Sequence, residues 1–285
     1  MPSLIDIRRR IRSVKSTQQI TRAMKLVSAA KLRRAQDRVL SARPYSASTA
    51  RLLADLARAA KTDERLGHPL LAERPAERIQ LILITSDRGL AGAFNSNLIK
   101  AAQQFLDEHG SRRVEFELVG RKGRDFFRKR GALVSGEHVG MTEKVTYDYA
   151  AGIAREVMAR FVAAEIDAVY LLYNEFKSVM AQRLSLSRIL PVELPSGSEP
   201  IGFLYEQAPE RLMERLLPRY VEIAIYQALL ESAAAQQAAR MTAMDAATTN
   251  AAEMIDNLTL YMNRVRQASI TREIIEVVSG AAGVE

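Results

Sequence analysis

The chain has 285 residues, no cysteine and a formal net charge of +8. Without cysteine it has no disulfide framework, no Cys-containing zinc site and no redox-active thiol. The N-terminus is basic but lacks the apolar core of a signal peptide, and the longest run without a charged residue covers only 11 residues, 89–99. We therefore expect a soluble protein that does not itself span a membrane but can attach to a membrane complex.

Long helices are predicted at both ends of the chain. Residues 1–66 contain no glycine and a single interior proline, Pro44, and residues 203–279 contain no glycine and no proline after Pro218. Glycine and proline are the residues that most often end helices, so their absence predicts helices of about 60–70 residues each. At ~1.5 Å per residue such a helix is about 90–100 Å long, several times the width of a small domain.

Apolar residues recur every three or four positions in both terminal segments. In the first segment this register comprises Leu4, Ile7, Ile11, Val14, Gln18, Thr21, Lys25, Ser28, Leu32, Ala35 and Val39. In the second it comprises Ile223, Gln227, Leu230, Ala234, Gln237, Met241, Met244, Thr248, Ala251, Ile255, Leu258, Met262 and Val265. Such a period is typical of a left-handed coiled coil, so we expect a long antiparallel pair; the alternative is two amphipathic helices packed on a globular core.

The positive charge is concentrated in the first helix. Residues 1–43 carry 12 Arg or Lys and two acidic residues, a net charge of +10, whereas residues 219–285 carry 5 Arg and 8 acidic residues, a net charge of −3. Opposite charges favour pairing of the two helices, although each exposed pair contributes only ~0.2–1 kcal/mol. The basic helix also predicts an acidic partner surface, which the sequence leaves open as protein, nucleic acid or lipid.

The apolar stripe of the last helix changes register near the C-terminus. Ile270, Ile274, Val277 and Ala281 are displaced by one position from the preceding register. Because a displaced stripe no longer faces the same partner, the end of this helix is expected to leave the coiled coil and present its apolar face elsewhere.

Glycine, proline and β-branched runs return between residues 68 and 205. Strands are expected at 79–85, 114–119 and 168–173, a strand or hairpin at 179–190, and helices at 94–109, 122–130 and 147–164. This alternation predicts a Rossmann-like α/β domain with a mainly parallel sheet. The expected organisation is an N-terminal coiled-coil helix (1–66), a central α/β domain (67–205) and a C-terminal coiled-coil helix (206–285).

The loop after the first expected strand, residues 86–92, contains glycine as phosphate-binding turns do. It has only Gly89 and Gly92, which do not form GxGxxG, and no GxxxxGK[ST] motif occurs in the chain. We therefore favour a tight turn between a strand and a helix over a nucleotide site.

Catalytic and metal-binding signatures are also missing from the sequence. The three histidines are far apart and belong to no zinc-binding motif: His68, His109 and His138. No G-x-S-x-G nucleophile motif occurs, and the carboxylates form no recognisable pair. We expect no catalytic residue, no metal site and no cofactor.

Three segments resemble the gamma subunit of F-type ATP synthases, in the same order along the chain. Residues 17–35, TQQITRAMKLVSAAKLRRA, are similar to its N-terminal helix, and residues 86–95, SDRGLAGAFN, to its internal signature. Residues 270–282, ITREIIEVVSGAA, are the most specific match, to its C-terminal signature. The matching positions there are Ile270, Thr271, Glu273, Glu276, Gly280 and Ala281. Gly283 departs from the family pattern, which usually has Ala, Ser or a basic residue, and this affects the extreme terminus alone.

The resemblance implies the central rotor shaft of an F1Fo ATP synthase. The paired helices would lie inside a ring of three alpha and three beta subunits, and the α/β domain beside the epsilon subunit and the membrane-embedded c-ring. The shaft would couple proton-driven rotation of the c-ring to ATP synthesis or hydrolysis at the beta subunits, and regulate ATPase activity and proton flow, as a non-catalytic subunit. Without a transit peptide or a Cys-containing insertion, the implied location is peripheral, on the cytoplasmic side of a bacterial inner membrane.

Six residues fall at positions that the resemblance associates with contacts to the ring. Met24 and Lys25 match the region that faces acidic loops of the beta subunits. A polar latch between shaft and ring is matched by Arg240, Gln267, Thr271 and Glu273. From the residues alone, each would be a solvated position on a helix.

Two other functions are open from the residues alone. A basic coiled-coil nucleic-acid-binding protein would bind DNA or RNA in a strongly salt-dependent way, but residues 1–43 contain no aromatic side chain to stack on bases. An enzyme that used the α/β domain would be stabilised by a nucleotide, but the chain lacks a phosphate loop and an acid–base signature. We therefore expect protein partners and no nucleic acid.

Overall fold

The computed structural model describes residues 3–60, 68–193, 207 and 209–282. The elements in chain order are α1 (Leu4–Ala60), the 3-10 helix η1 (Pro69–Leu71), β1 (Arg78–Ile84), α2 (Phe94–Glu108), β2 (Arg113–Val119), α3 (Arg121–Arg128), β3 (Val134–His138), α4 (Tyr147–Val162), β4 (Ala168–Phe176), β5 (Gln182–Leu190) and α5 (Pro209–Ala282). Both expected domain boundaries, 66/67 and 205/206, and Gly283 lie outside the described residues, so the domain limits stay predictions.

Two compact units make up the chain. One consists of Met1–Ser28 and Met241–Glu285, and the other of Ala29–Arg240. The long helices α1 and α5 contribute residues to both units, whereas the whole sheet belongs to the second.

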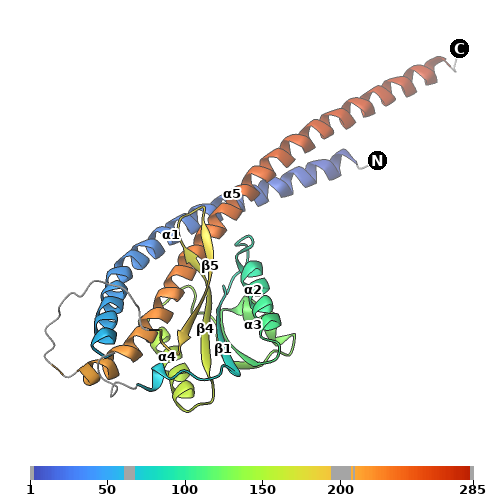
Figure 1. Ribbon diagram of the computed structural model, residues 1–285. Coiled ribbons are helices and arrows are strands. Elements are labelled where there is room, and N and C mark those ends of the chain that lie inside the picture. Colours follow the sequence, from blue (N-terminus) through green and yellow to red (C-terminus); the bar gives the residue numbers. More distant parts are fainter. Residues whose placement is uncertain (1–2, 61–67, 194–206, 208, 283–285) are drawn as a thin grey trace. The chain divides into compact units, whose positions relative to one another are not determined.

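In the first unit, α1 and α5 pair through the predicted register. Ile7 is buried in the seam, and the hydroxyl oxygens of Thr21 and Thr248 lie 2.8 Å apart across it. The ammonium of Lys25 reaches the carboxylate of Asp245 at 2.5 Å. Because later residues of α1 face earlier residues of α5, the helices run antiparallel, as predicted, and the start of α1 lies toward the same end of the pair as the end of α5 (Figure 1). Polar seam pairs of this kind fix the register.

The second unit contains a five-stranded sheet with the order β3-β2-β1-β4-β5. The first four strands in this order are parallel, and β5 pairs antiparallel with β4. The mainly parallel Rossmann-like sheet is therefore confirmed. The sequence did not predict β3, because its residues VSGEH form no apolar run and are mostly only half-buried.

Helices cover both faces of this sheet, which explains the continuous apolar run of β1. Phe116 of β2 stacks on Phe127 of α3 with ring centroids 4.4 Å apart. The adjacent Glu115 points to the opposite face, where its carboxylate is 2.7 Å from the guanidinium of Arg160 on α4. Every residue of β1 after Arg78 is accordingly buried.

Within the second unit, α5 runs between α1 and the α/β elements (Figure 1). On one side the hydroxyl of Ser46 on α1 donates to the amide oxygen of Gln227 at 2.7 Å. On the other side the hydroxyl of Tyr147 on α4 donates to the carboxylate of Glu222. As a result most of residues 221–240 are buried, including positions outside the predicted seam. Here α5 is a core helix as well as the partner of α1.

Candidate functional surfaces

The loops that follow β1, β2 and β3 meet at the carboxyl edge of the parallel strands, around the side chain of Asp87. Its Oδ1 accepts hydrogen bonds from the backbone N–H groups of Gly140 at 2.9 Å and Arg121 at 3.1 Å. Its Oδ2 accepts from the hydroxyl of Thr142 at 2.6 Å and from the backbone N–H of Thr142 at 3.3 Å. One carboxylate thus ties three loops together.

The surroundings of Asp87 keep it ionised. Burial on its own would raise the pKa of this carboxyl, but the hydrogen bonds from Gly140, Thr142 and Arg121 outweigh burial and hold the pKa below its ordinary value. The neighbouring turn also has a strict steric requirement. Gly120 has φ +93°, and a Cβ there would lie 2.3 Å from the carbonyl oxygen of Thr85. No larger residue fits at this position without moving the backbone.

Charged side chains connect these loops to both long helices. The guanidinium of Arg240 on α5 donates to the backbone carbonyl of Arg88 at 3.4 Å and to the side chain of Gln237 at 3.3 Å. The side chain of Arg88 in turn pairs with Glu143 at 2.9 Å. Glu143 also faces Lys31 of α1 at 3.9 Å. We call Lys31, Arg88, Glu143 and Arg240 the clamp.

Arg240 is the buried member of the clamp, with 6% of its surface exposed. Burial lowers the pKa of its guanidinium, Glu143 partly offsets this, and Arg88 adds to the lowering. Because a buried cation is costly unless its donors are satisfied, the hydrogen bond to the Arg88 carbonyl fixes the conformation of loop 86–95 against α5.

Doubly wound sheets bind their ligands beyond the carboxyl ends of the strands. In this chain Asp87 occupies that edge and binds the chain's own backbone, and Arg240 approaches it from α5. The loop is thus a tight internal junction between β1 and α2. Across the residues that the structure describes, no group of three or more His, Asp or Glu side chains is placed to hold a metal ion.

A second surface is formed by the free end of α5. Thr21 faces Thr248 and Lys25 faces Asp245. Continued in this antiparallel register, Leu4, the first residue of α1, reaches α5 near residue 265. Beyond that point α5 continues to Ala282 and its described side chains are almost all exposed. Three residues of the expected apolar stripe are among them: Ile270 is 48%, Ile274 57% and Val277 72% exposed. We call residues 266–282 the tip.

The six residues that the family resemblance singled out fall into three environments. Lys25 and its half-buried neighbour Met24 lie on the paired part of α1. Gln267, Thr271 and Glu273 are exposed on the tip, where the Thr271 hydroxyl donates to the Gln267 carbonyl at 2.9 Å. Arg240 belongs to the clamp, in the other unit.

The sequence reasoning missed Asp87, Thr142 and Glu143. Asp87 was part of the recognised segment 86–95, but its hydrogen-bond partners Arg121, Gly140 and Thr142 are 34, 53 and 55 residues away in sequence. A carboxylate directly after a buried strand was the available signal, since such a side chain needs several donors.

Fold and surfaces define a class of protein: two long paired helices, with a doubly wound α/β domain between them in sequence. A family model described as "ATP synthase" matches residues 3–284. The ATP synthase gamma chain of Solibacter usitatus is 63% identical over 286 residues, covering 100% of both chains. That of Pelotomaculum thermopropionicum is 50% identical, again over 100% of both chains. The chain belongs to the ATP synthase gamma chain family.

Solved structures agree on the fold. A chain of the Tetrahymena thermophila mitochondrial ATP synthase, in a structure of the central stalk and c-ring, is 25% identical with a TM-score of 0.64, covering 80% of this chain and 99% of that one. A chain of the Euglena gracilis mitochondrial ATP synthase, in a structure of OSCP, F1 and c-ring, is 18% identical with a TM-score of 0.71, covering 99% and 94%. No helix among the described residues is long and apolar enough to cross a membrane.

Proposed function

We propose that this chain is the central rotor shaft of an F1Fo ATP synthase and couples rotation of the c-ring to ATP synthesis or hydrolysis. The observation that carries the proposal is the family match over 3–284, which includes the projecting tip as well as the α/β domain. An unpaired apolar helix end suits insertion into a surrounding sleeve, because exposed apolar stripes of this kind mark interaction sites.

Its partners would be three alpha and three beta subunits around one copy of the shaft, the epsilon subunit and the c-ring. The chain would be non-catalytic, since the nucleotide sites would belong to the surrounding ring. It would be a peripheral part of a membrane-associated complex, on the cytoplasmic side of a bacterial inner membrane, and would regulate ATPase activity and proton flow. The basic face of α1 would then meet acidic protein loops, which makes nucleic acid unnecessary as a partner.

Reconstitution tests this proposal directly. The purified chain is mixed with matching alpha and beta subunits, and the mass of the assembly and its ATPase activity are measured with and without the chain. We expect a particle with three alpha, three beta and one copy of this chain, and cooperative ATPase activity that depends on it. Failure to assemble, with activity at the level of alpha and beta alone, would contradict the rotor role and make salt-dependent binding of DNA the next measurement.

The polar residues of the tip are proposed to form the latch between shaft and ring. Gln267, Thr271 and Glu273 are exposed, so their replacement by alanine leaves the fold intact. Coupled ATP synthesis in membrane vesicles should fall in Gln267→Ala and Glu273→Ala. Glu253→Ala is the matched control, because Glu253 is an exposed acidic residue of α5 outside the tip. Normal synthesis in the tip variants would remove these residues from the latch.

Met24 and Lys25 are proposed to transmit force to the acidic loops of the beta subunits. Because Lys25 also pairs with Asp245, its charge is already partly oriented toward the partner helix. Lys25→Glu should impair coupled ATP synthesis more than Arg22→Glu, which makes the same charge change at an exposed position of α1. Equal losses in both variants would mean that general charge on α1, and no specific contact, is responsible.

Arg240 is also proposed to belong to the latch between shaft and ring, where it would orient loop 86–95. Its side chain is buried and bonded to the Arg88 carbonyl, so its effect on the ring would be one of positioning. Arg240→Ala should lower both the free energy of unfolding and coupled synthesis. Arg240→Lys keeps the positive charge but replaces the planar guanidinium, with its several N–H donors, by a single ammonium. This variant should be nearly as stable as the wild type, and its coupled ATP synthesis should stay lower. Unchanged coupling in a folded Arg240→Ala protein would end this proposal.

A further inference from the structure

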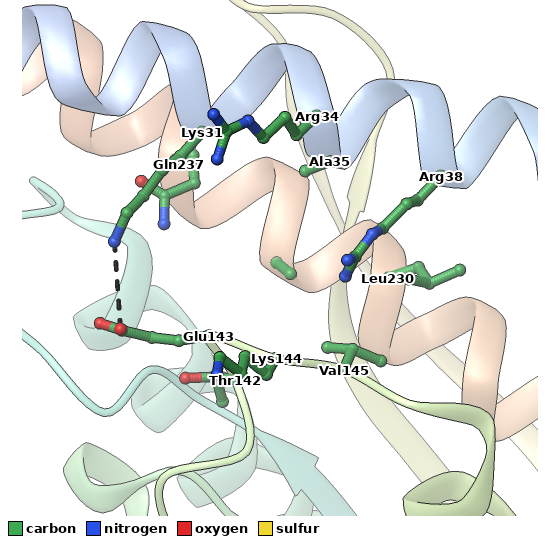
Figure 2. Close-up of a pocket in the computed structure, with 11 residues that line it drawn as sticks. Lys31, Arg34, Ala35, Arg38, Thr142, Glu143, Lys144, Val145, Leu230 and Gln237 are labelled. Carbon is green, nitrogen blue, oxygen red and sulfur yellow. Dashed lines mark ion pairs between the residues drawn. The ribbon is translucent and has the colours of Figure 1, made fainter.

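A groove in the second unit is lined by α1, α5 and the segment after β3, and has a volume of about 280 Å³. It is built from Lys31, Arg34, Ala35, Arg38, Thr142, Glu143, Lys144, Val145, Leu230, Ala233 and Gln237. Figure 2 shows Arg38 extending from α1 toward Val145, and Lys31 extending toward Glu143. Neither the clamp nor the tip accounts for the remaining basic side chains of this groove.

The charge of the groove is unbalanced. Four of its lining residues are basic and one is acidic, a net charge of +3. Glu143 faces Lys31 and pairs with Arg88, which leaves Arg34, Arg38 and Lys144 without a carboxylate partner among the described residues. The excess positive charge of these lining residues creates a positive potential that favours an anion in the groove.

The arrangement of the cations favours phosphate. Arg34 and Arg38 are four residues apart on α1, about one turn, and both line the groove. In Figure 2 the Arg34 side chain runs along α1 toward Lys31, and the Arg38 side chain extends toward Val145, so the two guanidiniums are spread along the groove. Guanidinium groups bind phosphate oxygens through two parallel hydrogen bonds, which makes arginine better suited than lysine to this ligand. Two guanidiniums and Lys144 match a ligand with adjacent phosphates better than one with a single carboxylate.

The floor of the groove limits what else the ligand carries. It consists of small and aliphatic side chains, Ala35, Val145, Leu230 and Ala233, and no aromatic residue lines it. A nucleobase would therefore find no ring to stack on. The volume of about 280 Å³ is also just below the range for small-molecule sites, about 300–1,000 Å³, so the ligand should be small.

We infer that this groove is a binding site for a chain of two or more phosphates, held by Arg34, Arg38 and Lys144. The phosphates come either from free pyrophosphate or from the tail of a nucleotide, and the chemistry of recognition is the same for both. This site is separate from the rotor role and does not depend on it.

Calorimetric titration of the full-length chain with pyrophosphate tests the inference. We expect a dissociation constant below about 1 mM at physiological salt, which corresponds to about −4 kcal/mol. The double variant Arg34→Gln/Arg38→Gln should weaken binding at least tenfold. Arg22→Gln/Arg33→Gln is the matched control, because it removes the same charge from exposed positions of α1 that do not line the groove.

The outcomes distinguish a specific phosphate site from attraction by the general positive charge of α1. Absence of pyrophosphate binding, or an equal loss in both double variants, would overturn the inference. Titrations with ATP and AMP identify the source of the phosphates. Similar affinities for pyrophosphate and ATP would mean that the groove recognises the phosphate chain alone. Tighter binding of ATP would mean that the ligand is a nucleotide. Binding of AMP as tightly as pyrophosphate would overturn the requirement for adjacent phosphates. Circular dichroism of each variant checks that the helices are retained.

Discussion

The same helix, α5, has opposite environments in the two units. Between residues 221 and 240 it is buried on nearly all sides between α1 and the α/β domain, and Ile225 is 0% exposed. In the tip its apolar residues face solvent, and Ile274 is 57% exposed. An apolar side chain therefore stabilises the fold in one region and is available to a partner in the other.

This difference separates stability from function along one helix. Substitutions in 221–240 act on the folded chain itself, because they remove buried contacts. Substitutions in the tip leave those contacts untouched and should appear in the assembled complex alone. Four predictions compare buried with exposed positions in the folded chain, beginning with the largest expected effect.

Ile225→Ala should lower the free energy of unfolding by about 2–5 kcal/mol, because it leaves a cavity where the side chain is fully buried. Ile274→Ala removes the same atoms from the tip and should change it by less than about 0.5 kcal/mol. Urea unfolding of the full-length variants, followed by circular dichroism, measures both values. Similar losses in the two variants would mean that the tip is also packed in the isolated chain.

Asp87→Ala should cost about 2–4 kcal/mol, since three loops lose their common acceptor. Asp107→Ala is the control, as Asp107 is an exposed acid on α2. Because the folded pKa of Asp87 is lowered, its contribution is complete above the unfolded pKa of about 4 and is lost as the pH falls through the folded value. The difference in free energy of unfolding between wild type and Asp87→Ala should therefore become smaller in acid. A difference that did not change with pH would mean that the packing of the side chain, and not its charge, causes the loss.

Glu231→Gln should stabilise the chain by about 1 kcal/mol at pH 7. Glu231 is 2% exposed, and one of its carboxylate oxygens has no hydrogen-bond partner among the described residues. Burial raises its pKa, against the hydrogen bond from Gln227 that lowers it. The charged form is thus disfavoured in the fold.

The pH dependence of this effect has the opposite sign to that of Asp87. With a raised folded pKa, the destabilisation by Glu231 is present at neutral pH and disappears as the pH falls through that pKa toward the ordinary value for Glu. Thermal unfolding of Glu231→Gln and wild type from pH 7 to pH 4.5 should therefore converge. Glu253→Gln, at an exposed position, should show no such trend, and an equal gain there would refute the explanation by burial.

Asp245→Asn should have the smallest effect, about 0.2–1 kcal/mol, because its pair with Lys25 is largely exposed to solvent. The loss should shrink further in high salt, since solvent screens exposed charges. Urea unfolding at two salt concentrations measures this change. A larger loss that did not depend on salt would contradict the view that the Lys25–Asp245 pair is a weak, solvent-screened contact.

The sequence by itself determined the elements whose signals are local or periodic. The absence of glycine predicted both long helices, and the 3.5-residue spacing predicted which side of α1 is buried, including Ile7, Leu32 and Val39. Buried apolar runs predicted β1 and β4 and the parallel sheet. The displaced stripe predicted the free tip, because losing register with a partner is already visible in spacing. Segments 17–35, 86–95 and 270–282 carried the family resemblance.

Tertiary structure alone decided how the ends of these elements are joined. Asp87 bonds to Gly140 and Thr142, and Arg240 to the Arg88 carbonyl 152 residues away, contacts that no sequence period encodes. The wide burial of α5 also arises only when α1 and the sheet pack on it from two sides. Strand β3 has too few apolar residues to be predicted, and it forms because β2 supplies a parallel edge for its backbone hydrogen bonds. The period of burial can be read from the order of residues in one segment, whereas hydrogen-bond partners and charge pairs depend on which segments the fold brings together.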